Sequence, residues 1–175
     1  ARIFNAAVAL GIPPADIAAQ ADSLQFCFSK GLSAPVGSAI CGSADFIEEA
    51  RRGRKIVGGG MRQAGVIAAA AIVALEKMVD RLAEDHENAR ILAEGLANIS
   101  GLNVDLDSVQ SNIVMVGFDN PSVDARDAVR AMIAKGLKLN AITPTQCRLV
   151  THYGIVRQDI DAALVMAREV MKELA

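Results

Sequence analysis

The sequence has very few aromatic residues: no tryptophan, one tyrosine and five phenylalanines among 175 residues. Any core must therefore be built mainly from aliphatic side chains, and a hydrophobic content of 52% argues against disorder. A strong charge of either sign is also lacking, because 18 basic and 20 acidic residues leave a net charge of −2. Nucleic-acid-binding proteins usually carry a basic excess, so we expect no nucleic-acid partner.

Cysteine is scarce too, and Cys27, Cys41 and Cys147 are widely spaced. They form no Cys-x-x-Cys pair, so the sequence predicts neither a disulfide framework nor a zinc site, and we expect no metal. Cys27 and Cys41 lie in apolar runs and are expected to be buried thiols, in keeping with a reducing cytoplasm. The most apolar run, 64–75, is too short for a membrane span of about 20 residues. It predicts instead a helix that is buried all round, in a large core or a subunit interface.

Hydrophobic periodicity and turn residues predict a mixture of helices and strands, with a composition change near residue 100. After that point the order β-β-α-β-β-α predicts an antiparallel sheet with helices on one face. We therefore expect an α/β chain with one domain over 1–100 and a small α+β domain over 101–175. Helices are expected at 3–10, 44–52, 62–79, 80–98, 123–135 and 157–174. Strands are expected at 24–28, 36–41, 102–106, 112–118, 137–142 and 148–151, the first two pairing in a sheet buried on both faces.

Lys30 is the residue with the clearest chemical potential, because it follows an apolar strand segment and precedes a glycine turn. On position alone, a solvated lysine at a strand end would be the better interpretation. Desolvation at such a place can instead lower the pKa of the amine and make it a nucleophile toward a carbonyl group. The surrounding residues favour the second interpretation: Lys30 stands in SKGLSAPVG at 29–37, and GGGMRQ follows at 58–63.

Two other segments carry basic side chains that could bind anions. The glycines at 58–60 and Arg62 could face an anion at a helix N-terminus, although a plain loop with Arg62 and Lys55 as surface charges is the simpler interpretation. Arg148, in CRLVTH, could hold a substrate carboxylate through two hydrogen bonds, or could be an ordinary strand-edge charge. His152 in the same segment could be a hydrogen-bonding residue behind the site or a core residue with its own partners, and we expect the second.

Four segments, in the same order, resemble the low-specificity threonine aldolases, which are pyridoxal 5′-phosphate (PLP) enzymes with the aspartate-aminotransferase fold. They are ARIFNA at 1–6, SKGLSAPVG at 29–37, GGGMRQ at 58–63 and RLVTH at 148–152. The resemblance runs over all 175 residues. It implies the C-terminal part of the PLP-dependent transferase fold, namely the end of the large α/β domain followed by a small α+β domain.

The resemblance also implies roles for five side chains. Lys30 matches the catalytic lysine that holds PLP as an imine, and Arg2 matches an arginine beside the cofactor that contacts the substrate carboxylate. Arg148 matches the second carboxylate arginine. Lys55 and Arg62 match basic residues that reach the site across a subunit interface, in what the resemblance implies is a homotetramer.

The implied reaction is retro-aldol cleavage of L-threonine or L-allo-threonine, a β-hydroxy-α-amino acid, to glycine and acetaldehyde. This would place the protein in threonine catabolism and glycine biosynthesis in the cytoplasm, with no membrane partner. In the family, the aspartate that pairs with the pyridine nitrogen and the phosphate-binding loop precede the matched segments, so we expect little activity from this chain alone. Two alternatives stay open: another PLP reaction on the same fold (transamination, β-elimination or racemisation) and a non-catalytic oligomerisation fragment.

Overall fold

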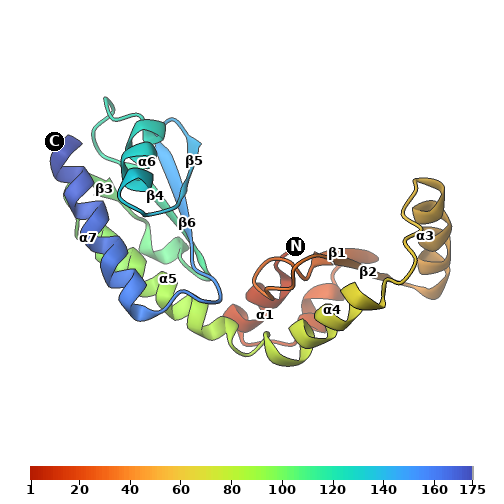
Figure 1. The fold of residues 1–175 in the computed structure, drawn as a ribbon. Coiled ribbons are helices and arrows are strands. Elements are labelled where there is room, and N and C mark those ends of the chain that lie inside the picture. The colour runs from red at the N-terminus through yellow and green to blue at the C-terminus, as the bar shows by residue number, and fades with distance from the viewer. Residues whose placement is uncertain (175) are drawn as a thin grey trace. The chain divides into compact units, whose positions relative to one another are not determined.

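The computed structural model describes residues 1–174, and the chain separates into two compact units, Ala1–Leu82 and Ala83–Ala175 (Figure 1). The division falls at the start of helix α5 (Leu82–Ala97), whereas the sequence predicts a domain boundary near residue 100, after that helix. The difference has a packing cause. Helix α5 buries Leu92 and Leu96 in the core of the second unit and so belongs with it.

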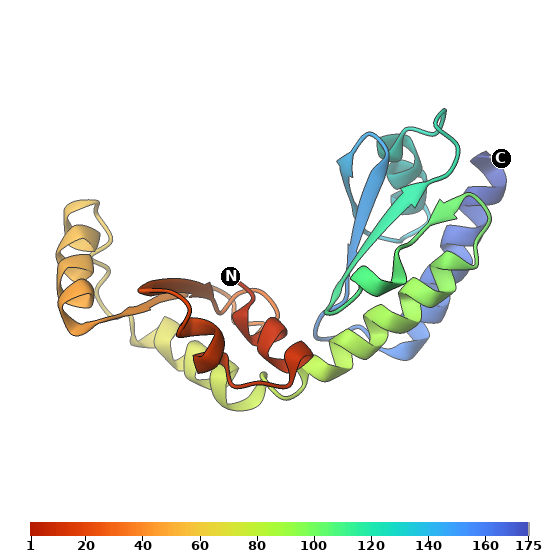
Figure 2. The same cartoon turned by 180° about the vertical axis from the view of Figure 1, so that it is seen from behind.

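The first unit consists of four helices and one pair of strands (Figures 1 and 2). The elements are α1 (Ile3–Leu10), α2 (Pro14–Ala18), β1 (Ser23–Cys27), β2 (Ser38–Gly42), α3 (Ala44–Ile56) and α4 (Gly65–Lys77). Strands β1 and β2 pair antiparallel, with Phe26 opposite Ala39, which confirms the predicted pairing. Their predicted burial on both faces is wrong, because no residue of β2 is buried and no third described strand joins the pair.

Aromatic contacts join α1 to β1. The rings of Phe4 and Phe26 meet edge to face with centroids 5.3 Å apart, and Phe26 and Phe28 meet at 4.9 Å. Such pairs contribute about 0.5–1.5 kcal/mol beyond their buried area. The backbone N–H of Cys27 also donates to the carbonyl of Ala1 at 3.4 Å. The start of the chain therefore lies beside the end of β1.

Helix α4 forms as predicted, but it is not buried within this chain. Val66 is 80% exposed, and Ile72 and Val73 are 54% and 55% exposed, whereas only Ala71 and Ala74 are buried. The first unit is too small to cover an apolar helix on every side. Burial at a subunit interface, the other expectation for this helix, stays a prediction. Among residues 1–174, no helix is long and apolar enough to cross a membrane.

The second unit is an antiparallel sheet covered by helices on one face, as predicted (Figures 1 and 2). The sheet order is β3-β4-β6-β5, and side chains alternate along the strands: Val114, Val116, Cys147 and Leu149 are buried against the helices. Residues between them, such as Arg148, belong to the opposite face. With α5, the elements are β3 (Leu102–Asn103), a 3₁₀ turn (Leu106–Ser108), β4 (Ile113–Phe118), α6 (Ala125–Ala134), β5 (Asn140–Thr143), β6 (Gln146–Val150) and α7 (Arg157–Leu174).

A buried polar cluster joins this sheet to α5. Asn112 and Thr151 are almost fully buried; the Asn112 side-chain amide donates to the Thr151 carbonyl at 2.6 Å, and the Thr151 N–H donates to the Asn112 carbonyl at 3.1 Å. The Thr151 hydroxyl donates to the carbonyl of Asp85 at 2.5 Å. Asp85 is itself fully buried, although it lies in a charged helix segment.

We expect Asn112→Ala to lower the free energy of unfolding of the second unit by about 2–3 kcal/mol, because it removes a buried hydrogen bond and leaves the Thr151 carbonyl unsatisfied. The matched control is Asn98→Ala, since the exposed Asn98 amide makes a similar bond to the Glu94 carbonyl at 2.7 Å. Exposed substitutions usually change stability by less than about 0.5 kcal/mol. Urea denaturation measures both variants, and equal losses would contradict a special role for the buried cluster.

The cysteines differ from expectation. Cys41 is exposed and Cys27 is half-buried, so the prediction of two buried thiols is wrong; the exposed strand pair gives them no cover. The buried cysteine is Cys147, a residue of β6 whose side chain belongs to the core of the second unit.

Burial raises the pKa of the Cys147 thiol from 9.0 to about 11, because the apolar core disfavours the thiolate. The unfolded chain releases this proton at lower pH than the native chain does. The contribution of Cys147 to the free energy of unfolding is therefore fully present below pH 9. It is lost as the pH rises toward 11, by at most about 2–3 kcal/mol. Between these two pH values, denaturation curves should show a smaller drop in the free energy of unfolding for Cys147→Ala than for the parent protein. An equal drop in both would show that the Cys147 thiol is not its source.

Candidate active site

Lys30 lies in a closed turn directly after β1, which we call the lysine turn (residues 28–34). The Ser33 N–H donates to the Lys30 carbonyl at 2.9 Å, and the Ala34 N–H donates to the Phe28 carbonyl at 3.0 Å. The Phe28 N–H in turn donates to the Gly37 carbonyl at 3.0 Å. Three backbone hydrogen bonds thus hold the turn. The Lys30 side chain is exposed on it, so the desolvation expected from the sequence is not found within this chain.

Apolar side chains of the lysine turn pack in a small buried core. Leu32 is 3% exposed and packs in a small core with Ala34, Ala74 and Leu82. Ser33 has a φ of +60°, in the left-handed region that non-glycine residues rarely adopt. The turn therefore carries an exposed amine on a backbone that hydrogen bonds and apolar packing hold in place.

Arg2 lies on a segment that the fold brings next to the lysine turn. It occupies the N-cap position of α1, is half-buried, and follows Ala1, whose carbonyl accepts the N–H of Cys27. Cys27 is the last residue of β1, and the lysine turn begins immediately after it. The structure thus places the segments that carry Arg2 and Lys30 side by side within the first unit.

Two of the three glycines at 58–60 use their N–H groups within the chain, which agrees with the simpler interpretation of a plain loop. The N–H of Gly58 donates to the Lys55 carbonyl at 3.2 Å, and that of Gly59 donates to the Arg54 carbonyl at 2.7 Å. Both groups therefore cap the C-terminal end of α3 and are not available to an anion. The Lys55 side chain lies over Gly60, where an added Cβ would come within 2.9 Å of Nζ.

Lys55 and Arg62 are both exposed. Strand β2 runs away from the lysine turn and ends at Gly42, after which Ser43 caps α3 by accepting the N–H of Phe46. Helix α3 accordingly stands beyond the far end of the strand pair (Figure 1). Helix α3 carries Lys55 and so places it on the far side of the strand pair from the lysine turn (Figure 1).

Arg148 lies in the middle of β6, opposite Met115 of β4 and Asn140 of β5. It is half-buried, and its Nε is buried without a hydrogen-bond partner among the described residues. A buried guanidinium N–H without an acceptor is costly, and a carboxylate ligand would satisfy it. This is the clearest structural sign of an anion-binding side chain in the second unit.

His152 is exposed, so the prediction of a core histidine is wrong. Strand β6 ends at Val150, and the chain then leaves the sheet through a turn in which Gly154 has a φ of +93°. The His152 ring nitrogen Nδ1 lies 2.9 Å from the Tyr153 carbonyl. The buried residue of this segment is Thr151, which the sequence pattern did not single out.

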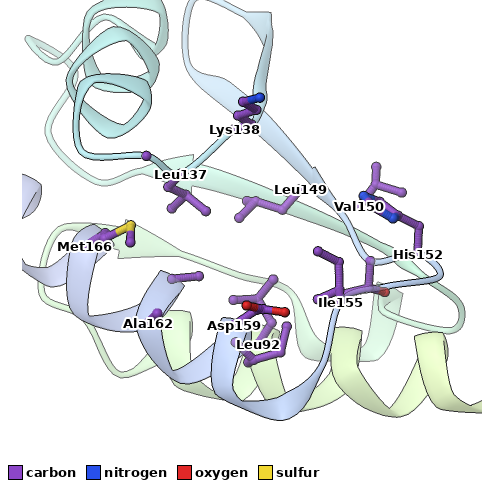
Figure 3. A pocket seen from close by; sticks show the side chains of 14 residues that line it. Leu92, Leu137, Lys138, Leu149, Val150, His152, Ile155, Asp159, Ala162 and Met166 are labelled. Carbon is purple, nitrogen blue, oxygen red and sulfur yellow. The ribbon is translucent and has the colours of Figure 1, made fainter.

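A cavity of about 500 Å³ opens between β6 and α7 in the second unit (Figure 3). Its walls are mainly apolar, with Leu149, Ile155 and Met166 inside and Lys138 and Asp159 among the polar groups. The Asp159 carboxylate already accepts the N–H of Val156 at 2.9 Å. None of the five predicted site residues lines this cavity, and residues 1–174 contain no cluster of side chains suited to a metal ion.

The sequence comparisons agree with the resemblance. The sequence model of the beta-eliminating lyase family matches residues 1–119. The chain is 41% identical over 172 residues to low-specificity L-threonine aldolase 1 of Arabidopsis thaliana, covering 98% of this chain and 48% of that protein. It is 44% identical over 160 residues to the low specificity L-threonine aldolase of Escherichia coli K12, covering 91% and 46%. The chain thus spans about half the length of the curated relatives it matches.

Solved structures confirm the predicted fold. A protein from Exiguobacterium, provisionally assigned as an aromatic amino acid beta-eliminating lyase/threonine aldolase, has a TM-score of 0.78 at 25% identity, covering 97% of this chain and 51% of that chain. A serine palmitoyltransferase from Sphingomonas wittichii has a TM-score of 0.73 at 21% identity, covering 91% and 42%. The chain therefore has the architecture of part of the PLP-dependent transferase fold.

Proposed function

The chain belongs to the beta-eliminating lyase family. We propose that it is the part of a PLP-dependent aldolase that contains the cofactor lysine, Lys30. The reaction is cleavage of L-threonine or L-allo-threonine to glycine and acetaldehyde. The observation that carries this proposal is the exposed Lys30 amine on a rigid turn, in a chain 41–44% identical to low-specificity threonine aldolases. A role in threonine catabolism and glycine biosynthesis in the cytoplasm is part of the proposal.

The residues present fit the cofactor and the substrate. Lys30 offers an accessible amine whose backbone is held by three hydrogen bonds, and Arg148 offers a buried Nε that lacks an acceptor. When bound, PLP supplies an electron-withdrawing ring that takes up the charge left on the substrate Cα as its bond to Cβ breaks. The fit therefore concerns both what Lys30 would hold and what Arg148 would bind.

Each side chain then has a defined task. Lys30 would hold the cofactor through Nζ and would keep its amine beside the substrate. Arg2 and Arg148 each bind the substrate carboxylate, and a carboxylate held in this way fixes which bond to Cα is aligned for cleavage. Lys55 and Arg62 act from a neighbouring subunit, as the resemblance implies, and helix α3 with Lys55 stands beyond the far end of the strand pair (Figure 1). The group that removes the β-hydroxyl proton is not among these residues.

Assembly into a homotetramer is also proposed. The support is the exposed apolar surface of the first unit, where Ile56 and Val57 are 82% and 83% exposed and Val66 on α4 is 80% exposed. Large exposed apolar patches mark surfaces that are covered in the working protein. Neither a nucleic acid nor a membrane is proposed as a partner.

The test uses the complete gene product, purified with PLP and assayed with L-threonine and L-allo-threonine. Formation of glycine and acetaldehyde in equal amounts is expected. Keto-acid formation, elimination products or a change of configuration at Cα would instead favour transamination, β-elimination or racemisation on the same fold. Absence of any PLP binding would favour the oligomerisation fragment and overturn the proposal.

A further inference from the structure

A close contact joins helix α1 to the lysine turn. Asn5 of α1 is a polar residue only 3% exposed, and it lies against Gly31, the neighbour of Lys30. A Cβ added at Gly31 would come within 2.5 Å of the Asn5 Oδ1 and 3.0 Å of the Leu82 Cδ2. Real Cβ atoms essentially never approach other heavy atoms this closely, so a larger residue at 31 would force the Asn5 side chain or the turn to move.

The position of Asn5 relates this contact to Arg2. Residues three apart lie on neighbouring positions of a helix surface, so Arg2 and Asn5 occupy the same side of the start of α1. Gly31 is joined directly to Lys30 by a peptide bond. One contact therefore links the segment that carries Arg2 to the segment that carries Lys30.

We infer that Asn5 is a positioning residue. Its side-chain amide packs against Gly31 and so fixes the position of Lys30 relative to Arg2. This inference rests on the proposed role of Lys30 as the cofactor lysine. A lysine on a flexible side chain would reach many places, and its Cα must be held for Nζ to return to one reacting atom. The closed backbone of the lysine turn transmits the constraint from Gly31 to Lys30, because Ser33 N–H is bonded to the Lys30 carbonyl.

The contact predicts an unusual pair of substitutions. Gly31→Ala adds a methyl group where Asn5 stands and should push the lysine turn away. Asn5→Ala removes the amide, so the turn loses its packing contact at Gly31 and should become more mobile. The double variant Asn5→Ala/Gly31→Ala replaces the lost side-chain volume with the new Cβ, so its effect should be smaller than that of either single variant.

The experiment is a double-mutant cycle in the complete gene product with two measurements. The first is hydrogen–deuterium exchange of residues 28–34 without cofactor, where each single variant should exchange at least about tenfold faster than the parent. The second is the rate at which PLP followed by borohydride labels Lys30, which should fall about tenfold in each single variant. Both measurements should return to within about threefold of the parent in the double variant.

Gly95→Ala is the matched control, because its new Cβ would collide with Leu164 in the core of the second unit. It should lower overall stability without changing exchange of the lysine turn or labelling of Lys30. Additive effects in the double variant, or an unchanged turn in Gly31→Ala, would overturn the inference. If the parent protein shows no label on Lys30, the proposed function fails, while the exchange measurements still decide the role of Asn5.

Discussion

Replacing Lys30 by alanine is expected to abolish covalent labelling by PLP and borohydride at the lysine turn. It should also reduce threonine cleavage by about four orders of magnitude, as removal of a covalent catalytic group commonly does. The physical reason is local: Lys30 is the exposed amine on a turn held by backbone hydrogen bonds, and the substitution leaves that backbone unchanged. Peptide mapping after reduction and a coupled acetaldehyde assay measure the two effects.

Two controls separate the amine from the charge and from general lysine reactivity. Lys30→Arg keeps a positive charge but cannot form the carbon–nitrogen link, so it should behave like Lys30→Ala. Lys172→Ala removes an exposed lysine from α7 in the second unit and should leave both measurements unchanged. Retention of the label on another lysine, with full activity in Lys30→Arg, would show that the cofactor lysine lies elsewhere.

The features that the sequence predicted well depend on local patterns. Helix α1 was expected at 3–10 and found at Ile3–Leu10, and α7 was expected at 157–174 and found at Arg157–Leu174. Helical periodicity and terminating residues are visible over one or two turns of chain, so no distant contact is needed to place them. The same holds for the order of strands and helices after residue 100.

Burial was predicted less well, because it depends on neighbours that the pattern does not name. The segment 36–41 reads as a buried strand, yet β2 belongs to a two-stranded pair with exposed faces. Helix α4 is apolar on all sides but is covered only along Ala71 and Ala74. Asp85 shows the opposite case: it lies in a charged helix segment, whose pattern gives no sign that this residue is fully buried.

The site residues divide in the same way. Lys30 could be singled out because its neighbours in sequence form a recognisable motif, whereas Asn5 acts through a contact with a distant segment and left no local signal. The glycine triplet left two interpretations open for a related reason. Glycine N–H groups can face an anion or cap a preceding helix, and the carbonyls of Arg54 and Lys55 decide in favour of the cap.

Replacing Arg148 by methionine gives the second large expected effect. Stability should be kept or increased, whereas kcat/KM should fall. Its Nε is buried without a partner in the absence of ligand, so Arg148→Met should leave the stability of the second unit unchanged or raise it by about 1 kcal/mol. The same variant should reduce kcat/KM about 100-fold to 1,000-fold, because a buried, hydrogen-bonded charge pair with the substrate carboxylate is lost.

The split between stability and catalysis distinguishes a ligand-binding arginine from a structural one. Met115, which faces Arg148 across the sheet, provides the matched control, since Met115→Leu changes the same open face without removing a charge. It should alter both measurements by less than about 1.5 kcal/mol. If Arg148→Met instead lowered the free energy of unfolding by several kcal/mol and left KM unchanged, Arg148 would be bonded within its own sheet and not to a substrate. Arg148→Lys should recover part of the lost kcat/KM, because it restores the charge but not the two-point geometry that a carboxylate requires.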